Sequence, residues 1–219
     1  FRSVENNLDQ TQWMQENVWP PKGNKTYRIP DQGIKSIIDD LSQTVYDRKE
    51  KNTQAWLDEL VQTKNAHSLS FDLETMEKDT RFAGRAKLSF KAKIHQPTAI
   101  LSAMLVEKGK QVRLTSQLDG DENTSFVFQM ESEPSDYFVI TRGWMNAQNR
   151  LNNYAKVAID PNAWNTYAFE FVTNDYTIPA GHTLSLILYG MDVDQTQLPT
   201  TVTEIEIDTA SIVCDCPID

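Results

Sequence analysis

Residues 137–150, YFVITRGWMNAQNR, form the stretch that decides the fold class of this chain. Residues 137–140 are aromatic or mostly β-branched, a composition that favours a β-strand. The strand leads into Arg142, Gly143 and Trp144, where the glycine predicts a corner, and a polar segment ending at Asn149 and Arg150 follows. The stretch therefore predicts a strand that closes on a corner rather than part of a helix.

Further strands are predicted on both sides of this stretch. Apolar and polar residues alternate in residues 69–73 and 88–94, the period of a half-buried strand. The glycine of residues 108–110 predicts a hairpin turn between strands at 100–106 and 112–118. The other predicted strands are residues 126–130, 154–159, 167–172, 184–189 and 201–213. About nine or ten strands without intervening helices predict an antiparallel β-sandwich, and we expect the jelly-roll type.

The N-terminal quarter has a different pattern. The prolines of residues 19–21 predict an extended segment. A helix is predicted after Gly33, with apolar residues at Ile34, Ile37, Ile38, Leu41 and Val45. Thr53 is a suitable N-cap for a second helix, whose apolar face holds Trp56, Leu57, Leu60 and Val61. We expect one domain, in which an extended and helical segment (residues 1–64) packs on a sandwich (residues 65–219).

Charge and hydropathy exclude two classes of partner. The 219 residues include 31 acidic and 21 basic side chains, which gives a net charge of −10. This charge repels phosphate backbones and anionic lipids, so we expect neither nucleic acid nor a membrane surface as a partner. No apolar run reaches the roughly 18–20 residues that cross a bilayer, and the N-terminal residues lack the features of a signal peptide. Because the sequence starts at Phe1 within a polar stretch, we expect a piece of a longer polypeptide.

The two cysteines, Cys214 and Cys216, lie one residue apart in a predicted strand and therefore point to the same side. A disulfide across one residue is strained, and two thiolates alone do not complete a tetrahedral zinc site. We therefore expect free, reduced thiols. Reduced thiols are typical of intracellular proteins, so we expect a cytoplasmic location.

Several stretches resemble a known family. Residues 137–150 resemble the strand and Arg-Gly-aromatic corner in the C-terminal β-sandwich of Xaa-Pro dipeptidyl peptidases and of related α/β-hydrolase serine peptidases and acylases. Residues 177–186, TIPAGHTLSL, resemble a turn with Gly-His before an alternating strand in that family, and Gly181 can adopt the positive φ of such a turn. Residues 81–92 and 101–110 resemble earlier strands of the same sandwich. The inserted segment before residue 65 favours the intracellular dipeptidyl peptidases over the ester hydrolases and acylases.

The resemblance implies a non-catalytic C-terminal domain of a proline-specific serine peptidase. Such an enzyme removes N-terminal Xaa-Pro dipeptides through an acyl-enzyme, without a cofactor. The implied partners are an upstream catalytic α/β-hydrolase domain of the same polypeptide and, through it, a peptide substrate. The domain would contribute stability and help to bound the substrate entrance. The alternative is a free-standing jelly-roll module that binds a saccharide or a peptide.

The residues agree with the absence of a catalytic centre. A nucleophile elbow needs Gly-x-Ser-x-Gly, because its sharp turn tolerates only small neighbours. The sequence has eight glycines, and no two of them lie four positions apart. His67, His95 and His182 have no sequence context that suggests a poised base. We therefore assign no catalytic residue to this chain.

Metal and sugar sites were also weighed. Asp192 and Asp194 form one acidic pair, and a loop carries oxygen ligands of the kind calcium prefers at Asp119, Asp121, Glu122 and Asn123. The EF-hand spacing is absent and charged turns are commonly solvated, so we predict no metal and no cofactor. The five tryptophans would suit a sugar platform if exposed, but such residues more often anchor cores and interfaces. They are Trp13, Trp19, Trp56, Trp144 and Trp164.

Arg142, Trp144, Asn149 and Arg150 have two interpretations. In the structural one, Arg142 pairs with a carboxylate, Gly143 makes the corner, Trp144 fills a gap, and the polar tail satisfies backbone groups of a loop. In the functional one, this corner faces the catalytic domain and forms an interdomain contact that shapes access to the active site. Arg and Trp are enriched at the centres of interfaces, which favours the second interpretation for two of the four residues.

Overall fold

A computed structural model describes most of the chain, namely residues 2–4, 13–15, 17–21, 23–30, 33–40, 53–118, 126–130 and 133–218. Within these ranges the structure is mainly β, with one α-helix and one short 3-10 helix, η2 (Ala147–Asn149). None of the helices in this described part is long and apolar enough to cross a membrane.

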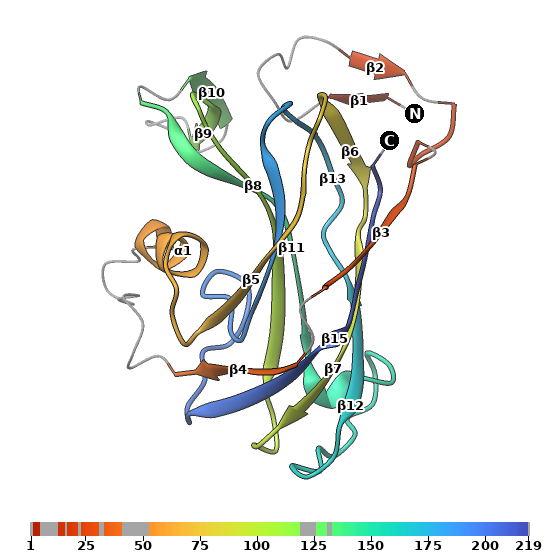
Figure 1. Ribbon diagram of the computed structural model, residues 1–219, viewed down its shortest axis with the longest axis vertical. Helices are drawn as coiled ribbons and strands as arrows, with labels where there is room; N and C mark the ends of the chain where they lie inside the picture. Colours follow the sequence, from red (N-terminus) through yellow and green to blue (C-terminus); the bar gives the residue numbers. More distant parts are fainter. Residues whose placement is uncertain are drawn as a thin grey trace.

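Two antiparallel sheets form a sandwich (Figure 1). The four-stranded sheet has the order β11-β8-β14-β5, with β5 (Ser68–Thr75), β8 (Ile100–Gln111), β11 (Ser135–Asn146) and β14 (Thr183–Tyr189). The five-stranded sheet has the order β12-β7-β15-β3, and β4 also pairs with β15. Its strands are β3 (Lys25–Arg28), β4 (Ile34–Asp39), β7 (Lys87–Ile94), β12 (Asn165–Glu170) and β15 (Thr203–Cys216). The predicted antiparallel β-sandwich is confirmed, and its jelly-roll type stays a prediction.

Three two-stranded ladders extend this frame. They pair β1 (Arg2–Val4) with β2 (Trp13–Gln15), β6 (Thr80–Gly84) with β13 (Asn174–Ile178), and β9 (Leu114–Leu118) with β10 (Phe126–Met130). In Figure 1 the β9–β10 hairpin projects away from the sandwich, above α1.

The core lies between the two sheets, where alternate residues point inward. On β7 the predicted alternation is confirmed, since Leu88, Phe90, Ala92 and Ile94 are all buried. They share one apolar cluster with Leu184, Leu186 and Leu188 of β14 and with Leu101, Ala103 and Leu105 of β8. Burying one such side chain contributes about 1.5–3 kcal/mol, so this cluster is the main source of the sandwich's stability.

One helix covers the outer face of the four-stranded sheet. The helix α1 (Thr53–Gln62) buries the predicted apolar face of Trp56, Leu57, Leu60 and Val61. These side chains pack on the outward residues Met104, Val106, Ile187 and Tyr189. The second predicted helix is therefore confirmed, and β14 is buried on both faces.

The first predicted helix is wrong. Residues 34–39 form β4, which pairs with β15 from Ile34–Asp208 to Asp39–Thr203. The branched isoleucines suit an extended backbone, and a strand satisfies the backbone groups along β15, which outweighs the helical spacing. Leu41 and Val45, the other residues of that prediction, lie outside the described residues.

Two predicted turns are also wrong. β8 runs without a break through residues 108–110, where we expected a hairpin. Gly109 serves another purpose there, because a Cβ at this position would lie 2.2 Å from Cγ of His182. Likewise, Gly143 does not make a corner but lies inside β11, where a Cβ would lie 2.9 Å from the backbone oxygen of Glu170. Both glycines allow close approach of a distant segment.

The segment that we predicted as a strand at residues 154–159 is irregular. By contrast, the Gly181 turn is confirmed, with φ of +82° and a hydrogen bond from its N–H to the carbonyl oxygen of Met76 at 2.8 Å. Cys214 and Cys216 are free and buried, with their sulfur atoms 3.6 Å apart. The hydrogen bond with Cys214, together with burial, raises the pKa of the Cys216 thiol.

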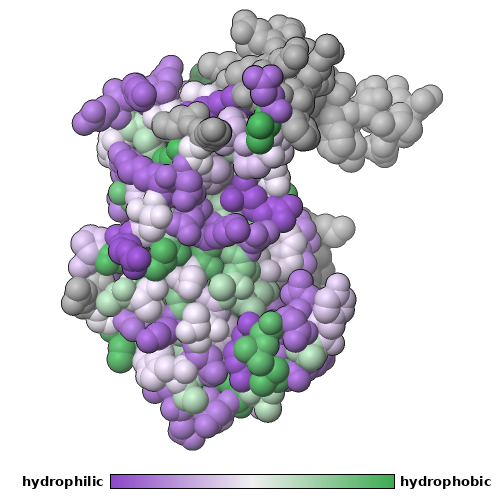
Figure 2. Space-filling model, turned by 90° about the vertical axis from the view of Figure 1, so that its right-hand side faces the viewer, coloured by the Kyte–Doolittle hydropathy of each residue, from purple (hydrophilic) through white to green (hydrophobic). Residues whose placement is uncertain are grey.

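The outer face of the five-stranded sheet is polar. It carries exposed ion pairs, such as Arg85 with Glu170 at 2.7 Å, and Lys93 with Glu206 at 3.0 Å. Figure 2, viewed from the right-hand side of Figure 1, shows hydrophilic residues over much of the face that it presents. Ion pairs of this kind contribute little to stability, so this face is suited to solvent.

Candidate functional site

The predicted site residues divide into two pairs. Arg142 and Trp144 lie two positions apart on β11, and Arg142 is paired with Met104, whose side chain packs beneath α1. They therefore share the outer face of the four-stranded sheet. Asn149 and Arg150 follow in η2 and the loop after it. The structure thus brings the first two together on the side of the sandwich that α1 occupies.

Arg142 holds a carboxylate pair, as the structural interpretation predicted. Its Nη1 lies 3.4 Å from Oδ1 of Asp192 and 3.0 Å from Oδ2 of Asp194, and its guanidinium lies 5.8 Å from the ring centre of Trp56. The side chain of Asp192 is fully buried and also accepts a hydrogen bond of 2.7 Å from the Tyr189 hydroxyl. Burial lowers the pKa of Arg142, but the charges beside it, first that of Asp192, outweigh burial and raise it.

A groove of about 520 Å³ opens beside this ion pair. Arg142, Trp144 and Asp194 line it together with Val172, a residue that is 55% exposed. Charged, aromatic and aliphatic side chains meet here, which is the mixture found at the centres of protein interfaces.

A second groove of about 390 Å³ lies between α1 and β11. It shares Val139 and Arg142 with the first, so the two form one continuous hollow along β11. Its polar wall is fixed: the Tyr137 hydroxyl donates to Asp58 at 2.8 Å and accepts from Gln54 at 2.9 Å. Burial, and then the contact with Asp58, raises the pKa of Tyr137, which therefore stays a neutral donor.

Asn149 and Arg150 have local partners. Arg150 donates to the carbonyl oxygens of Val157 at 3.1 Å and Ala158 at 3.0 Å, while Asn149 donates to that of Ala155 at 3.4 Å. These contacts confirm the structural interpretation for the polar tail, which satisfies backbone groups of the loop. The loop contains the segment that we predicted as a strand, and these bonds hold it in its irregular path.

The sequence did not reveal a buried charged cluster at the other end of β8. Glu107 is fully buried, and both of its oxygens lie 2.8 Å from Nη2 of Arg113, itself 4% exposed. Glu107 also accepts a hydrogen bond of 2.8 Å from the Tyr176 hydroxyl and contacts Nδ1 of His182. The expected hairpin at Gly109 concealed this cluster, because it placed Glu107 and Arg113 on separate strands. Its charges neutralise one another, which is typical of a structural cluster.

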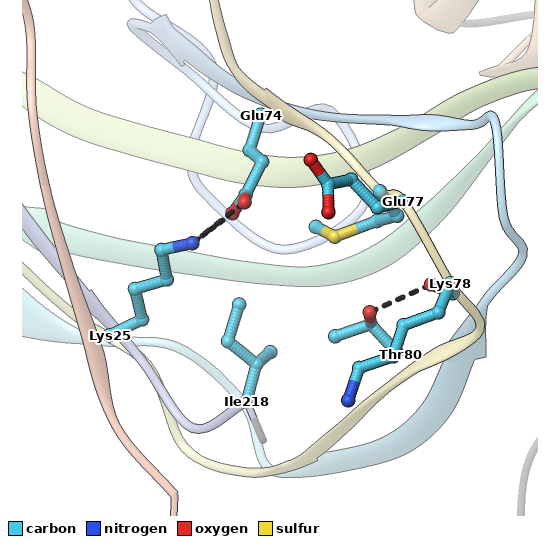
Figure 3. Close-up of a pocket in the computed structure, with 7 residues that line it drawn as sticks. Lys25, Glu74, Glu77, Lys78, Thr80 and Ile218 are labelled. Atoms are coloured by element: carbon cyan, nitrogen blue, oxygen red, sulfur yellow. Dashed lines mark hydrogen bonds and ion pairs between the residues drawn. The ribbon is translucent and has the colours of Figure 1, made fainter.

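A third hollow of about 370 Å³ lies at the end of the sandwich near the C-terminal residues (Figure 3). Lys25 reaches Glu74 at 2.6 Å, and Tyr27 donates to the same carboxylate at 2.6 Å. The hydrogen bonds from Lys25 and then from Tyr27 lower the pKa of Glu74. Glu77 and Lys78 add one charge of each sign, so the hollow does not select a ligand by charge.

The acidic residues considered as metal ligands have other positions. Asp192 and Asp194 hold Arg142, and residues 119–123 lie outside the described residues. In the part of the chain that the structure describes, no three His, Cys, Asp or Glu side chains form a group that could hold a metal ion.

Comparison with known proteins places the chain among peptidases. A sequence model of the family described as "X-Pro dipeptidyl-peptidase C-terminal non-catalytic domain" matches residues 3–215. A putative Xaa-Pro dipeptidyl-peptidase of Streptomyces avermitilis is 23% identical over 94% of this chain and 34% of its own length. The Xaa-Pro dipeptidyl-peptidase of Streptococcus gordonii is 27% identical over 93% of this chain and 28% of its own length, and that of Lacticaseibacillus rhamnosus is 30% identical over 65% and 19%. The chain spans about a third or less of the length of these curated relatives.

Solved structures show the same fold. An α-amino acid ester hydrolase matches 95% of this chain with 39% of its own, at a TM-score of 0.67 and 13% identity. An aminopeptidase from a marine sediment archaeon, Thaumarchaeota archaeon, matches 99% of this chain with 41% of its own, at a TM-score of 0.64 and 11% identity. In both, the matching region is again less than half of a longer chain.

Proposed function

Because the chain belongs to the family of X-Pro dipeptidyl-peptidase C-terminal non-catalytic domains, we propose that it is the non-catalytic part of a larger proline-specific serine peptidase. The parent enzyme would remove Xaa-Pro dipeptides from the N-termini of peptides, with its nucleophile, acid and base in an upstream α/β-hydrolase domain. The observation that carries this proposal is the family match over residues 3–215, in a chain that spans only 34% of a relative named for this activity.

The sequence supports the division of labour. Its glycines rule out a Gly-x-Ser-x-Gly elbow, so an acyl-enzyme would need a serine from elsewhere in the polypeptide. Peptide substrate would then reach this domain only through the catalytic part. Two buried free thiols support a cytoplasmic enzyme.

We place the contact with the catalytic part at Arg142 and Trp144, on the hollow along β11. The groove there is large enough to receive several side chains, and its arginine is already neutralised, which reduces the cost of covering it. Asn149 and Arg150 would support this contact indirectly by fixing the loop that follows β11. The contact would stabilise the assembly and help to bound the substrate entrance.

The experiment that tests the proposal starts from the gene. We expect the coding sequence upstream of Phe1 to encode a hydrolase domain with Gly-x-Ser-x-Gly. The longer polypeptide should release Ala-Pro from a chromogenic Ala-Pro substrate, and replacing the serine of that motif by alanine should abolish turnover. An open reading frame that starts near Phe1 would refute the proposal, as would a longer polypeptide inactive on Xaa-Pro substrates.

A further inference from the structure

The β9–β10 hairpin has an apolar face that the described structure leaves without a partner. Its register pairs Leu114 with Met130, Ser116 with Phe128, and Leu118 with Phe126. Residues directly opposite each other in an antiparallel pair lie on the same face, and successive residues alternate between faces. One face of the hairpin therefore carries five large apolar residues: Leu114, Leu118, Phe126, Phe128 and Met130.

The opposite face is mostly polar. It carries Thr115, Gln117, Val127 and Gln129. A hairpin with one apolar and one polar face is the pattern of an element that packs on something through one side only.

Among the described residues, β9 and β10 pair only with each other. No other described helix or strand packs extensively on them, and Figure 1 shows the hairpin projecting from the sandwich. An isolated two-stranded hairpin is only marginally stable, and an uncovered patch of this kind commonly marks an interaction site. The apolar face therefore calls for a surface to cover it.

The base of the hairpin is firmly anchored. Arg113, the residue before β9, donates to the carbonyl oxygen of Ser135 at 2.5 Å and to its hydroxyl at 2.8 Å. Ser135 is the first residue of β11, so this contact joins the two ends of the excursion. The same guanidinium is held by buried Glu107 and by the carbonyl oxygen of Gly109 at 2.5 Å. The buried charged cluster thus fixes where the hairpin leaves the sandwich.

We propose that this hairpin is a docking arm whose apolar face packs on the catalytic part of the longer polypeptide, an inference that rests on the proposed function. Relatives devote two thirds or more of their length to regions outside this chain, which supplies a partner of sufficient size. The arm is also continuous with the proposed contact, because Arg113 and Ser135 line the same groove as Val139 and Arg142. A second copy fits less well, since two chains of net charge −10 repel each other.

The test compares Phe128→Asp with Val127→Asp in the longer polypeptide. Both introduce the same charge at neighbouring positions of β10, but on opposite faces of the hairpin. By hydrogen–deuterium exchange, we expect Phe128→Asp to speed exchange of the amides in residues 114–118 and 126–130 at least tenfold. Val127→Asp should leave these rates within about twofold of the parent, as a change on a solvated face does. Equal effects of the two variants would overturn the docking arm.

A second measurement does not depend on any variant. The same amides should exchange at least tenfold more slowly in the longer polypeptide than in the 219-residue chain. Equal rates would overturn the proposal, and so would slow exchange in the 219-residue chain that increases with its concentration, because that identifies a second copy as the occupant. Hydrolysis of the Ala-Pro substrate is measured in parallel. If the longer polypeptide is inactive but protects the hairpin, the peptidase assignment fails while docking on the upstream part stands.

Discussion

Arg142 is the residue at which the structural and functional interpretations meet. It compensates the fully buried carboxylate of Asp192, which otherwise keeps only Tyr189 and backbone N–H groups as partners. Removing one partner of a buried ion pair is costly, so we expect Arg142→Ala to lower the free energy of unfolding by about 3 kcal/mol in a denaturant titration. Arg85→Ala removes a pair that is about half exposed and should cost less than about 1 kcal/mol.

The same variant separates the two roles. Reduced kcat/KM of the longer polypeptide for the Ala-Pro substrate, without loss of domain stability, would show that Arg142 serves mainly the interdomain contact. If stability and kcat/KM both stay at the parent values, neither interpretation of Arg142 holds.

Gly143 supports a second prediction at this scale. A Cβ at this position would lie 2.9 Å from the backbone oxygen of Glu170 and 3.1 Å from Cδ2 of Phe169. A backbone atom in a paired strand cannot rotate away, so the two sheets must shift. We expect Gly143→Ala to destabilise the domain by about 1–3 kcal/mol, measured as a lower denaturation midpoint. An unchanged midpoint would mean that β11 and β12 are farther apart than described.

Asp39 makes stability depend on pH. Burial raises the pKa of its carboxyl to about 6, although the hydrogen bond from the Met191 N–H opposes this. The unfolded chain titrates near pH 4 (about 3.9 for Asp), so the folded state binds this proton more tightly. Its contribution to stability is therefore lost as pH rises from about 4 to about 6, and the deficit persists above that range.

The neutral variant Asp39→Asn keeps an acceptor for Met191 and cannot ionise. We expect it to be more stable than the parent by about 2 kcal/mol at pH 8, and no more stable near pH 4, in parallel thermal and denaturant titrations. Equal destabilisation at both pH values would contradict this account of the carboxyl.

At the scale of elements, α1 is the piece that makes the outer face of the four-stranded sheet dry. Leu60 is 2% exposed and packs in the cluster beneath the helix. We expect Leu60→Ala to cost about 2–5 kcal/mol of unfolding free energy, because it leaves a cavity as well as removing apolar contacts. Gln62→Ala, on the exposed side of the same helix, should stay within about 0.5 kcal/mol. Similar effects of the two would mean that α1 does not rest on the sheet.

Local pattern was sufficient for elements whose burial is decided by their own sequence. The spacing of Trp56, Leu57, Leu60 and Val61 located α1, and strict alternation located β7. Residues 34–39 fitted a helix equally well, and only pairing with β15, far along the chain, makes them a strand. Gly109 was misinterpreted for the same reason, since the ring that requires a glycine belongs to His182.

The candidate site was predictable in kind but not in arrangement. A carboxylate partner for Arg142 follows from the cost of leaving a guanidinium unpaired, whereas its identity as Asp192 and Asp194 depends on the segment after β14. The hollow along β11 also needs α1 beside it, and nothing in the sequence of either element shows that they are neighbours.

For the whole molecule, the two faces of the sandwich have different roles. One sheet presents a solvated face with exposed ion pairs. The other carries α1, the hollow with Arg142 and, at its far end, the apolar hairpin. This asymmetry fits a domain that meets one large partner on one side, as expected for the non-catalytic part of a longer peptidase.

The most direct test of this central claim is hydrolysis of an Ala-Pro chromogenic substrate, measured on two purified proteins at equal molar concentration. We predict that the longer polypeptide releases Ala-Pro and that the 219-residue chain shows no turnover above the buffer rate. Turnover by the 219-residue chain that persists at constant specific activity through further purification would contradict the account.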